Sequence, residues 1–364
     1  MHVVFAPDKF AGTLTALEAA SAMATGWARR SPDDELVQVP MSDGGPGFVD
    51  VLHAALGGDL HAVTVSDPYG EPVPAAVLRV GATAYVECAQ AVGLHLRAPA
   101  DRHPEHATTR GLGELLGHAL DGGASRVVVG LGGSGTNDGG AGLLAGLGAT
   151  SEGGALDQGP AGLPDLTAVS LEAARARLAG VELVLATDVD NPLLGINGAT
   201  KIYGPQKGLP DDRLLAVDGW LQHLADLTDR KVAAQKGAGA AGGLGFALLL
   251  LGGTRESGVE VVADAVGLSE RVRGADLVVT GEGAFDFSSR SGKVPYGVAE
   301  IAARHLVPCI ALAGQVLVGS REMRALGVES AYSMVELVGE ERALGAPAQA
   351  LADLAARTAR TWSR

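Results

Sequence analysis

The residues whose types and spacing most clearly suggest chemistry lie in a glycine-rich stretch, Gly130–Gly140. It follows three valines typical of a buried strand, Val127–Val129, and precedes a small apolar run typical of a helix, Ala141–Leu147. Glycine lets a backbone approach a ligand closely, and N–H groups between a strand and a helix start can face an anion. We therefore expect a phosphate or a carboxylate to bind here. The residues expected to form this site are Gly132, Gly133, Ser134, Thr136, Asn137 and Asp138.

Two other interpretations of this stretch remain open. Gly130–Gly135 matches the dinucleotide-binding pattern G-x-G-x-x-G, but the segment after Gly148 lacks the second strand which that pattern requires. A tight glycine turn that serves packing alone is the other interpretation. A Walker A loop is excluded, because Gly292-Lys293 is followed by Val294 and lacks the required first glycine.

Two carboxylates follow the predicted buried strand Val181–Thr187. Asp188 and Asp190 flank one residue, so side-chain alternation places both on one side of an extended chain. Such a pair can hold Mg²⁺, or one member can accept a proton from an attacking hydroxyl. The alternative is a capped turn before Pro192, since Asp and Asn favour such turns.

Further polar residues follow predicted strands near both ends of the chain. Ligands bind at the carboxyl ends of strands in open α/β sheets, which favours a functional interpretation of these positions. We expect Asp8 and Asp43 to orient substrate hydroxyls, and we expect the glycines and Glu282 to line the substrate and cofactor sites. The residues at these strand ends are Asp8, Asp43, Gly44, Gly45, Gly281 and Glu282.

Lysines at three positions can neutralise phosphate charge, because each lies beside glycines or at the end of a predicted element. Lys293, at a predicted helix start, is expected to stabilise a transferring phosphoryl group. Lys207 is expected to contact the cofactor, and Lys9 follows the first strand. The alternative for each is a solvated surface lysine. The nine histidines show no metal-binding spacing, which excludes a zinc site.

The order of expected elements predicts an α/β protein of two domains. Strands alternate with helices at both ends of the chain, which favours one parallel sheet built from both ends. Between them, alternating segments at His61–Ser66, Ala75–Val80 and Thr83–Cys88 are typical of antiparallel strands. We expect a discontinuous parallel-sheet domain, residues 1–66 plus 270–364, and an inserted mixed α/β domain with glycine-rich loops, residues 67–269.

Composition excludes several classes of function. The chain has 364 residues and a net charge of −14, which argues against nucleic-acid binding. No apolar run is long enough to span a bilayer, and the N-terminus lacks a secretory signal. Cys88 and Cys309 lie in apolar segments far apart in sequence and are expected to stay reduced. These features predict a cytoplasmic protein with a small-molecule substrate, no nucleic-acid partner and no membrane association.

Taken together, the motifs resemble those of the type 1 glycerate kinase family, the bacterial glycerate 2-kinase-like proteins. They occur in the family's order and cover nearly the whole chain. The matching segments are Ala6–Phe10, Met41–Gly45, Gly130–Gly142, Ala186–Gly195, Tyr203–Gly208, Gly237–Gly245, Thr280–Gly283 and Ser291–Lys293.

The resemblance implies a flavodoxin-like domain built from both ends of the chain, an inserted domain, and an active site in the cleft between them. It implies ATP-dependent phosphorylation of D-glycerate, usually at the 2-hydroxyl, with Mg²⁺. On this expectation Asp188 and Asp190 are catalytic residues and metal ligands, and Lys293 is catalytic. The chain would act as a monomer or a homodimer.

Five positions depart from the family's usual residues and keep two alternatives open. A kinase of the same fold could act on another small hydroxy acid or polyol, or the chain could be a non-catalytic ligand-binding relative. Two cations and one carboxylate of the family pattern are missing. The departing residues are Ala11, Pro46, Phe48, Ala284 and Phe285.

Overall fold

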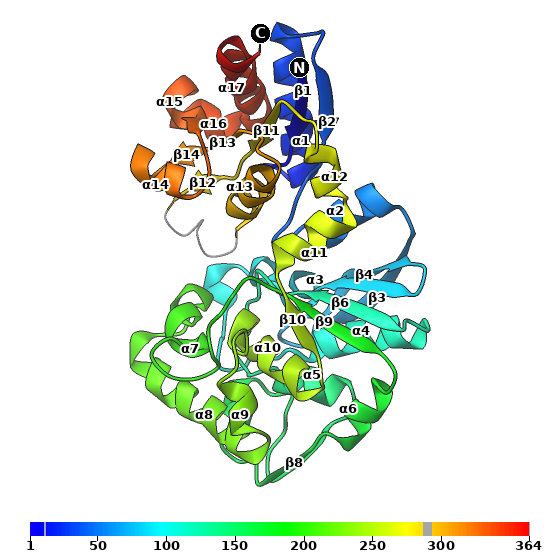
Figure 1. Cartoon of the computed structure of the whole chain (residues 1–364). Coiled ribbons are helices and arrows are strands. Elements are labelled where there is room, and N and C mark those ends of the chain that lie inside the picture. Colours follow the sequence, from blue (N-terminus) through cyan, green and yellow to red (C-terminus); the bar gives the residue numbers. More distant parts are fainter. Residues whose placement is uncertain (11, 287–292, 364) are drawn as a thin grey trace. The chain divides into compact units, whose positions relative to one another are not determined.

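Two β-sheets organise the chain in the computed structural model, which describes residues 1–10, 12–286 and 293–363 (Figure 1). Each sheet lies in its own unit of dense internal contacts. The first unit contains Met1–Asp43, Asp50–Leu56 and Val259–Arg364, and the second contains Gly44–Val49 and Gly57–Gly258. The first unit therefore includes both ends of the chain.

The first unit is built on a five-stranded sheet in which every neighbouring pair is parallel. Counted in chain order within this unit, its strands run 2-1-3-4-5, so the order reverses between β1 and β11. The carboxyl ends of the two strands at such a reversal are where these sheets bind ligands. The strands in spatial order are β15 (Ser330–Ser333), β13 (Cys309–Ala313), β11 (Leu277–Thr280), β1 (His2–Phe5) and β2 (Glu35–Gln38).

Helices cover this sheet with small apolar side chains. Helix α1 (Ala16–Arg30) begins at a capping box, in which the Thr15 hydroxyl accepts from Glu18 N and the Glu18 carboxylate accepts from Thr15 N. It packs against α17 (Pro347–Trp362), with Trp27 fully buried. The other helices of this unit are α11 (Gly258–Ala265), α12 (Leu268–Val272), α13 (Val294–Arg304), α14 (Ser320–Ala325), α15 (Met334–Val338) and α16 (Glu340–Gly345), and α2 (Phe48–Leu56) has residues in both units.

The second unit is built on a mixed six-stranded sheet. Strands β3, β4 and β5 pair antiparallel, whereas β5, β6, β9 and β10 pair parallel. In spatial order the strands are β10 (Thr254–Glu256), β9 (Glu182–Ala186), β6 (Arg126–Gly130), β5 (Thr83–Glu87), β4 (Pro72–Val80) and β3 (Asp59–Ser66). Its helices are α3 (Cys88–Val92), α4 (Arg110–Asp121), α5 (Ala141–Gly146), α6 (Glu172–Arg177), α7 (Ala199–Tyr203), α8 (Leu214–Leu227), α9 (Arg230–Ala233) and α10 (Ala240–Leu250).

Strand β3 pairs with β4 over its full length and lies in the second unit. One sequence expectation about short strands needs correction. The segment after Gly148 does contain a short strand, β7 (Thr150–Glu152). That strand pairs antiparallel with β8 (Ala168–Ser170) in a separate sheet, so the second strand of a dinucleotide unit is still missing.

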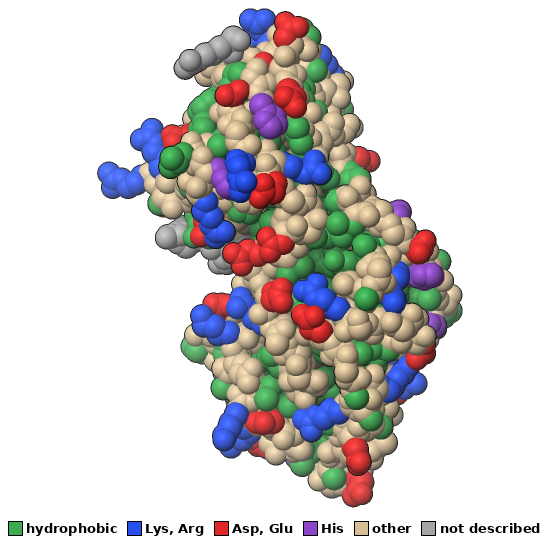
Figure 2. All heavy atoms as spheres, turned by 45° about the vertical axis from the view of Figure 1, so that its right-hand side comes forward, with side chains coloured by type: hydrophobic (Ala, Val, Ile, Leu, Met, Phe, Trp, Pro, Cys, Tyr) green, Lys and Arg blue, Asp and Glu red, His purple; other side chains and the backbone are tan. Residues whose placement is uncertain are grey.

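Surface and burial features agree with the composition. No helix in the described residues is long and apolar enough to cross a membrane. Both cysteines are free and buried, and burial raises the pKa of each thiol to about 12. On the face that Figure 2 presents, acidic and basic side chains are interspersed rather than gathered by sign.

Candidate active site

In the first unit, the loops after β1 and β11 bring predicted site residues together. The Asp8 N–H donates to the Gly281 carbonyl at 2.8 Å, and the Thr280 hydroxyl donates to the Ala6 carbonyl at 2.9 Å. These bonds join the two loops where the strand order reverses. The charged side chains around them form the first-unit cluster, which contains Asp8, Lys9, Asp43, Glu282, Asp286 and Lys293.

Asp8 is a buried carboxylate of this cluster, and its pKa is raised. It is 6% exposed, and its Oδ1 accepts the Lys9 N–H at 2.7 Å. Lys9 Nζ lies 3.5 Å from Asp8 Oδ1 and 3.6 Å from Asp43 Oδ1. Burial raises the pKa of Asp8 to about 7, the Asp43 carboxylate adds to the rise, and Lys9 opposes it. A carboxylate with a pKa near neutrality can both hold and release a proton at physiological pH.

This raised pKa predicts a stability effect of Asp8→Asn. Between an unfolded pKa near 3.8 and a folded pKa of about 7, the folded state holds a proton that the unfolded chain has released. Wild-type stability therefore falls as pH rises through this window, whereas Asp8→Asn lacks the effect. Urea unfolding should show the variant gaining at least about 1 kcal/mol over wild type at pH 8 and little at pH 4. An equal difference at both pH values contradicts the raised pKa.

Lys293 lies at the N-cap of α13, as its predicted position at a helix start requires. Its Nζ is 3.6 Å from Glu282 Oε2 and 3.7 Å from Asp286 Oδ1. Glu282 is 5% exposed, and its charge also contributes to the raised pKa of Asp8. Lys293, Glu282 and Asp8 thus belong to one electrostatic group in this unit.

In the second unit, the predicted anion loop follows β6 and is held in a fixed conformation. Leu94 N donates to Gly133 O at 2.8 Å, and Gly135 N donates to Val92 O at 2.7 Å. Within the described part of the chain, the N–H groups of Gly132, Gly133 and Ser134 donate to no protein acceptor. A row of unpaired N–H groups in a glycine turn favours binding of an anion over a turn that serves packing alone.

Buried polar atoms without partners continue this loop. Thr136 is fully buried, and its Oγ1 has no hydrogen-bond partner among the residues that the structure describes. Asn137 donates from Nδ2 to Thr200 Oγ1 at 3.0 Å, but its Oδ1 has no partner. Unsatisfied buried polar atoms are costly, so they favour a bound ligand or water at this loop.

Asp138, predicted to bind substrate, is fully occupied by protein donors. Its Oδ2 accepts from Thr109 N, Thr109 Oγ1 and Gly142 N at 2.8, 2.8 and 3.1 Å, and its Oδ1 accepts from Gly140 N at 2.9 Å. Burial raises the pKa of Asp138, and these hydrogen bonds oppose the rise. The carboxylate therefore shapes the start of α5 and ties it to Thr109, at the N-cap of α4.

The second glycine stretch packs directly against the first. Ala241, Gly242 and Gly243 have φ of 52°, 74° and 91°, so the start of α10 is a left-handed kink. Gly139 N donates to Gly242 O at 3.1 Å. A Cβ on Gly243 would lie 2.5 Å from the Gly139 Cα, which explains glycine at this position.

The carboxylates after β9, predicted to be metal ligands, differ from one another in their surroundings. The Asp190 side chain is 56% exposed, and it pairs with Arg255 Nη2 at 2.6 Å and Lys236 Nζ at 3.1 Å. Asp188 is half-buried. No group of three or more His, Cys, Asp or Glu in the described residues could hold a metal ion. In this structure Asp190 is held by two cations, and the roles of Asp188 and Asp190 as Mg²⁺ ligands stay a prediction.

Glycines 44 and 45, predicted to bind substrate, pack closely against the anion loop. A Cβ on Gly44 would lie 2.6 Å from Ala186 O, and a Cβ on Gly132 would lie 2.5 Å from the Gly45 Cα. This close approach supplies a packing reason for Gly44 and for Gly132. Asp43, which directly precedes Gly44, belongs to the first unit.

The described positions that depart from the family pattern serve packing. Phe48 is fully buried, with its ring 6.3 Å from that of Tyr85. Ala284 and Phe285 form β12, which pairs with β14 (Gln315–Val316), and Phe285 is fully buried. Pro46 Cγ would lie 2.8 Å from a Cβ on Gly133. Ala11 lies outside the described residues, as do Ser291 and Gly292.

Two polar residues of these sites carry no local sequence signal. Arg255 lies on the edge strand β10, pairs with Asp190, and has a buried Nε without a partner. Thr109 precedes α4 and supplies two of the four donors to Asp138. Only their pairing across long sequence separations identifies them, since each looks like an ordinary surface or capping residue in the sequence.

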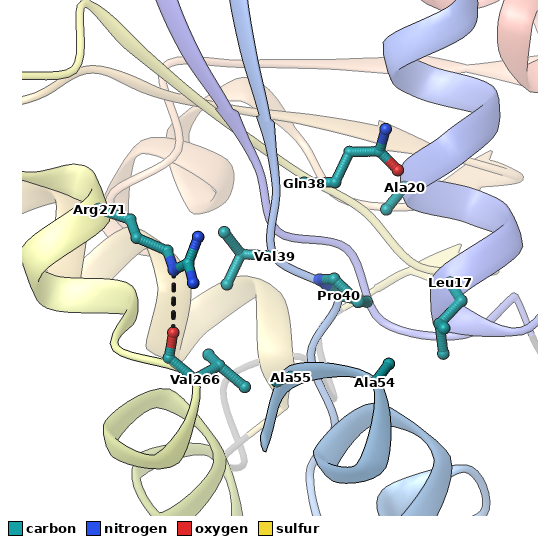
Figure 3. Close-up of a pocket in the computed structure, with 9 residues that line it drawn as sticks. All are labelled: Leu17, Ala20, Gln38, Val39, Pro40, Ala54, Ala55, Val266 and Arg271. Carbon is teal, nitrogen blue, oxygen red and sulfur yellow. Dashed lines mark hydrogen bonds between the residues drawn. The ribbon is translucent and has the colours of Figure 1, made fainter. Parts of the chain in front are cut away.

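A cavity of about 300 Å³ in the first unit has a different character (Figure 3). Its walls are mostly apolar and come from α1, the end of β2, α2 and the segment Val266–Arg271. The Arg271 Nε donates to the Val266 carbonyl at 3.0 Å. No predicted substrate or cofactor residue lines this cavity, so it is not the candidate active site.

Comparisons with known proteins agree with these features. Residues 3–363 match the Glycerate kinase family. The chain is 41% identical to the glycerate kinase of Bacillus subtilis (strain 168), covering 92% of this chain and 90% of the relative. It is 38% identical to the glycerate 2-kinase of Escherichia coli (strain K12), covering 93% of this chain and 92% of that relative. A protein of known crystal structure from Salmonella typhimurium LT2 has 37% sequence identity to this chain. The two structures superpose with a TM-score of 0.83, covering 99% of this chain and 98% of that protein.

Proposed function

Because this chain belongs to the glycerate kinase family, we propose that it transfers the γ-phosphoryl group of ATP to D-glycerate, at the 2-hydroxyl. The relatives named glycerate kinase and glycerate 2-kinase support this substrate and reaction. The strand order 2-1-3-4-5 of the first unit supports its assignment as flavodoxin-like. The observation that carries the mechanism is the buried Asp8 carboxylate beside Lys9, at the reversal point of the parallel sheet.

We assign Asp8 as the proton acceptor, in place of the predicted Asp188 or Asp190. The glycerate hydroxyl gives its proton to Asp8 as its oxygen bonds to the γ-phosphorus of ATP, and the bond to the ADP oxygen breaks. Asp43 orients the hydroxyl, and Lys9 and Lys293 neutralise charge on the transferring group. A carboxylate whose pKa lies near neutral pH suits this role.

The loop of the second unit serves the same reaction by holding an anionic group of one substrate. Gly132, Gly133 and Ser134 offer unpaired N–H groups to it, and the Thr136 hydroxyl can donate to it as well. The Asn137 Oδ1 only accepts, so it suits a hydroxyl of the ligand or a water. Hydrogen bonds from backbone amides to an anion are stronger than those between neutral groups. We propose that Asp138 maintains the shape of this loop and does not touch the substrate.

Release of ADP, measured with a panel of small hydroxy acids and polyols, tests this function. We expect D-glycerate to be turned over with the highest kcat/KM of the panel. Faster turnover of another acceptor would favour the same-fold kinase with a different substrate. Binding of ATP and D-glycerate without ADP release would favour a non-catalytic relative.

Asp190→Asn distinguishes the two candidate proton acceptors. Because the Asp190 carboxylate is exposed and paired with Arg255 and Lys236, its loss is expected to change kcat by less than about tenfold. Steady-state kinetics under saturating D-glycerate and ATP measure this directly. A loss of 10²-fold or more in Asp190→Asn would instead return the proton-accepting role to the carboxylates after β9.

A further inference from the structure

Lys207 is a buried cation that forms no salt bridge with a carboxylate of the described residues, although the charge of the buried Asp138 acts on it. It ends the short turn Pro205–Lys207 and is only 2% exposed. Its Nζ donates to Ser134 Oγ at 2.9 Å and to the Thr136 carbonyl at 2.5 Å. No carboxylate among the described residues lies within ion-pair distance of it. Burying an unpaired charge is costly, so this ammonium needs a compensating role.

The Lys207 ammonium fixes the direction in which Ser134 can donate. An ammonium only donates hydrogen bonds, so Ser134 Oγ must act as the acceptor in this pair. The hydroxyl proton of Ser134 is then left for another acceptor, and among the described residues it has none. It is therefore available to an anion beside the unpaired N–H groups of Gly132 and Gly133.

The second glycine stretch leaves room for this ammonium. A Cβ on Gly242 would lie 2.7 Å from Lys207 Nζ and 1.9 Å from the Thr136 carbonyl oxygen. Gly242 also adopts φ of 74°, which other residues rarely adopt. Gly242 thus permits Lys207, Ser134 and Thr136 to meet in one buried contact.

We propose that Lys207 is a positioning residue that turns the Ser134 hydroxyl toward an anionic oxygen of the substrate and strengthens its donation, without touching the substrate. This inference rests on the proposed function and replaces direct contact between Lys207 and the cofactor. The ligand group is a carboxylate or phosphate oxygen. The KM for D-glycerate and the KM for ATP distinguish these two sources, because only one of them should respond.

A double-mutant cycle of Ser134→Ala, Lys207→Met and the double variant tests this role. If Lys207 acts through Ser134, each single variant raises the same KM by about 10- to 100-fold, and the double variant raises it no further. Multiplied effects in the double variant would overturn the proposal, because they indicate that Lys207 contacts the ligand independently. Lys231→Met, an exposed lysine of α9, is the control and should leave both KM values unchanged.

A pH profile tests the same proposal without replacing the lysine, should Lys207→Met fail to fold. Burial lowers the pKa of Lys207 to about 8, so its charge is lost above that pH. The facing titratable groups are Cys88, whose thiol stays protonated until about pH 12, and the buried Asp138. The affected KM should rise above pH 8 in wild type and stay level in Ser134→Ala. An equal rise in both proteins overturns the proposal.

Failure of the proposed function gives a different result. Wild-type protein that releases no ADP with D-glycerate contradicts the kinase assignment. Calorimetry then gives the dissociation constants of D-glycerate and of ATP for each variant of the cycle. Losses of affinity that do not add in the double variant still support the positioning role of Lys207, and additive losses still contradict it. If neither compound binds wild-type protein, the positioning role is overturned together with the kinase assignment.

Discussion

Asp8→Asn is expected to lower kcat by about 10²- to 10⁴-fold, the usual contribution of a general base. The substitution keeps the size of the side chain but removes the group that accepts the hydroxyl proton. The buried position and the nearby Asp43 give this carboxyl its pKa of about 7, so wild-type kcat/KM should fall about tenfold per pH unit below pH 7. Steady-state assays of ADP release from pH 5 to 9 measure both the loss of kcat and the pH dependence of kcat/KM.

Asp33→Asn, at an exposed carboxylate of the same unit, is the matched control and should keep wild-type kinetics. The expected gain in stability of Asp8→Asn at pH 8 separates loss of chemistry from loss of folding. If Asp8→Asn retains kcat within threefold of wild type, Asp8 is not the proton acceptor.

Asp138→Ala is expected to lower the free energy of unfolding by about 3 kcal/mol. The substitution leaves four buried donors, on Thr109, Gly140 and Gly142, without their acceptor. The energetic cost of burying the carboxylate is removed at the same time, which keeps the loss below the sum of four hydrogen bonds. Urea unfolding monitored by circular dichroism gives the value.

Asp157→Ala is the control for this comparison, since its carboxylate is one-third exposed and pairs with Arg110 at the surface. Loss of this carboxylate should lower the free energy of unfolding by less than about 1 kcal/mol. An Asp138→Ala variant as stable as Asp157→Ala would contradict the structural role and would restore Asp138 as a candidate substrate ligand.

Local sequence patterns were sufficient to place the elements that carry the site. Apolar runs predicted β1, β6, β9 and β11, and the polar residues directly after them could be read from the sequence. The capping box at Thr15 and Glu18 likewise follows from residue spacing alone. These features depend only on residues that are close together in the sequence, so local patterns predict them.

The distinction among the carboxylates depends on tertiary burial and could not be predicted. Asp8 and Asp190 both follow buried strands, yet one is buried beside Asp43 and the other is exposed between Arg255 and Lys236. Lys207 was predicted to contact the cofactor, but its burial and its contact with Ser134 inside the second unit could not be predicted from its neighbours in sequence. Pairings across 70 or more residues leave no trace in local spacing.

Phosphorus NMR of the product formed from ATP and D-glycerate tests the central proposal most directly. We expect wild-type protein to form 2-phosphoglycerate and Asp8→Asn to form none that is detectable under the same conditions. Formation of 3-phosphoglycerate would contradict the proposed site of phosphorylation. Absence of any phosphoglycerate from folded wild-type protein would contradict the kinase activity itself.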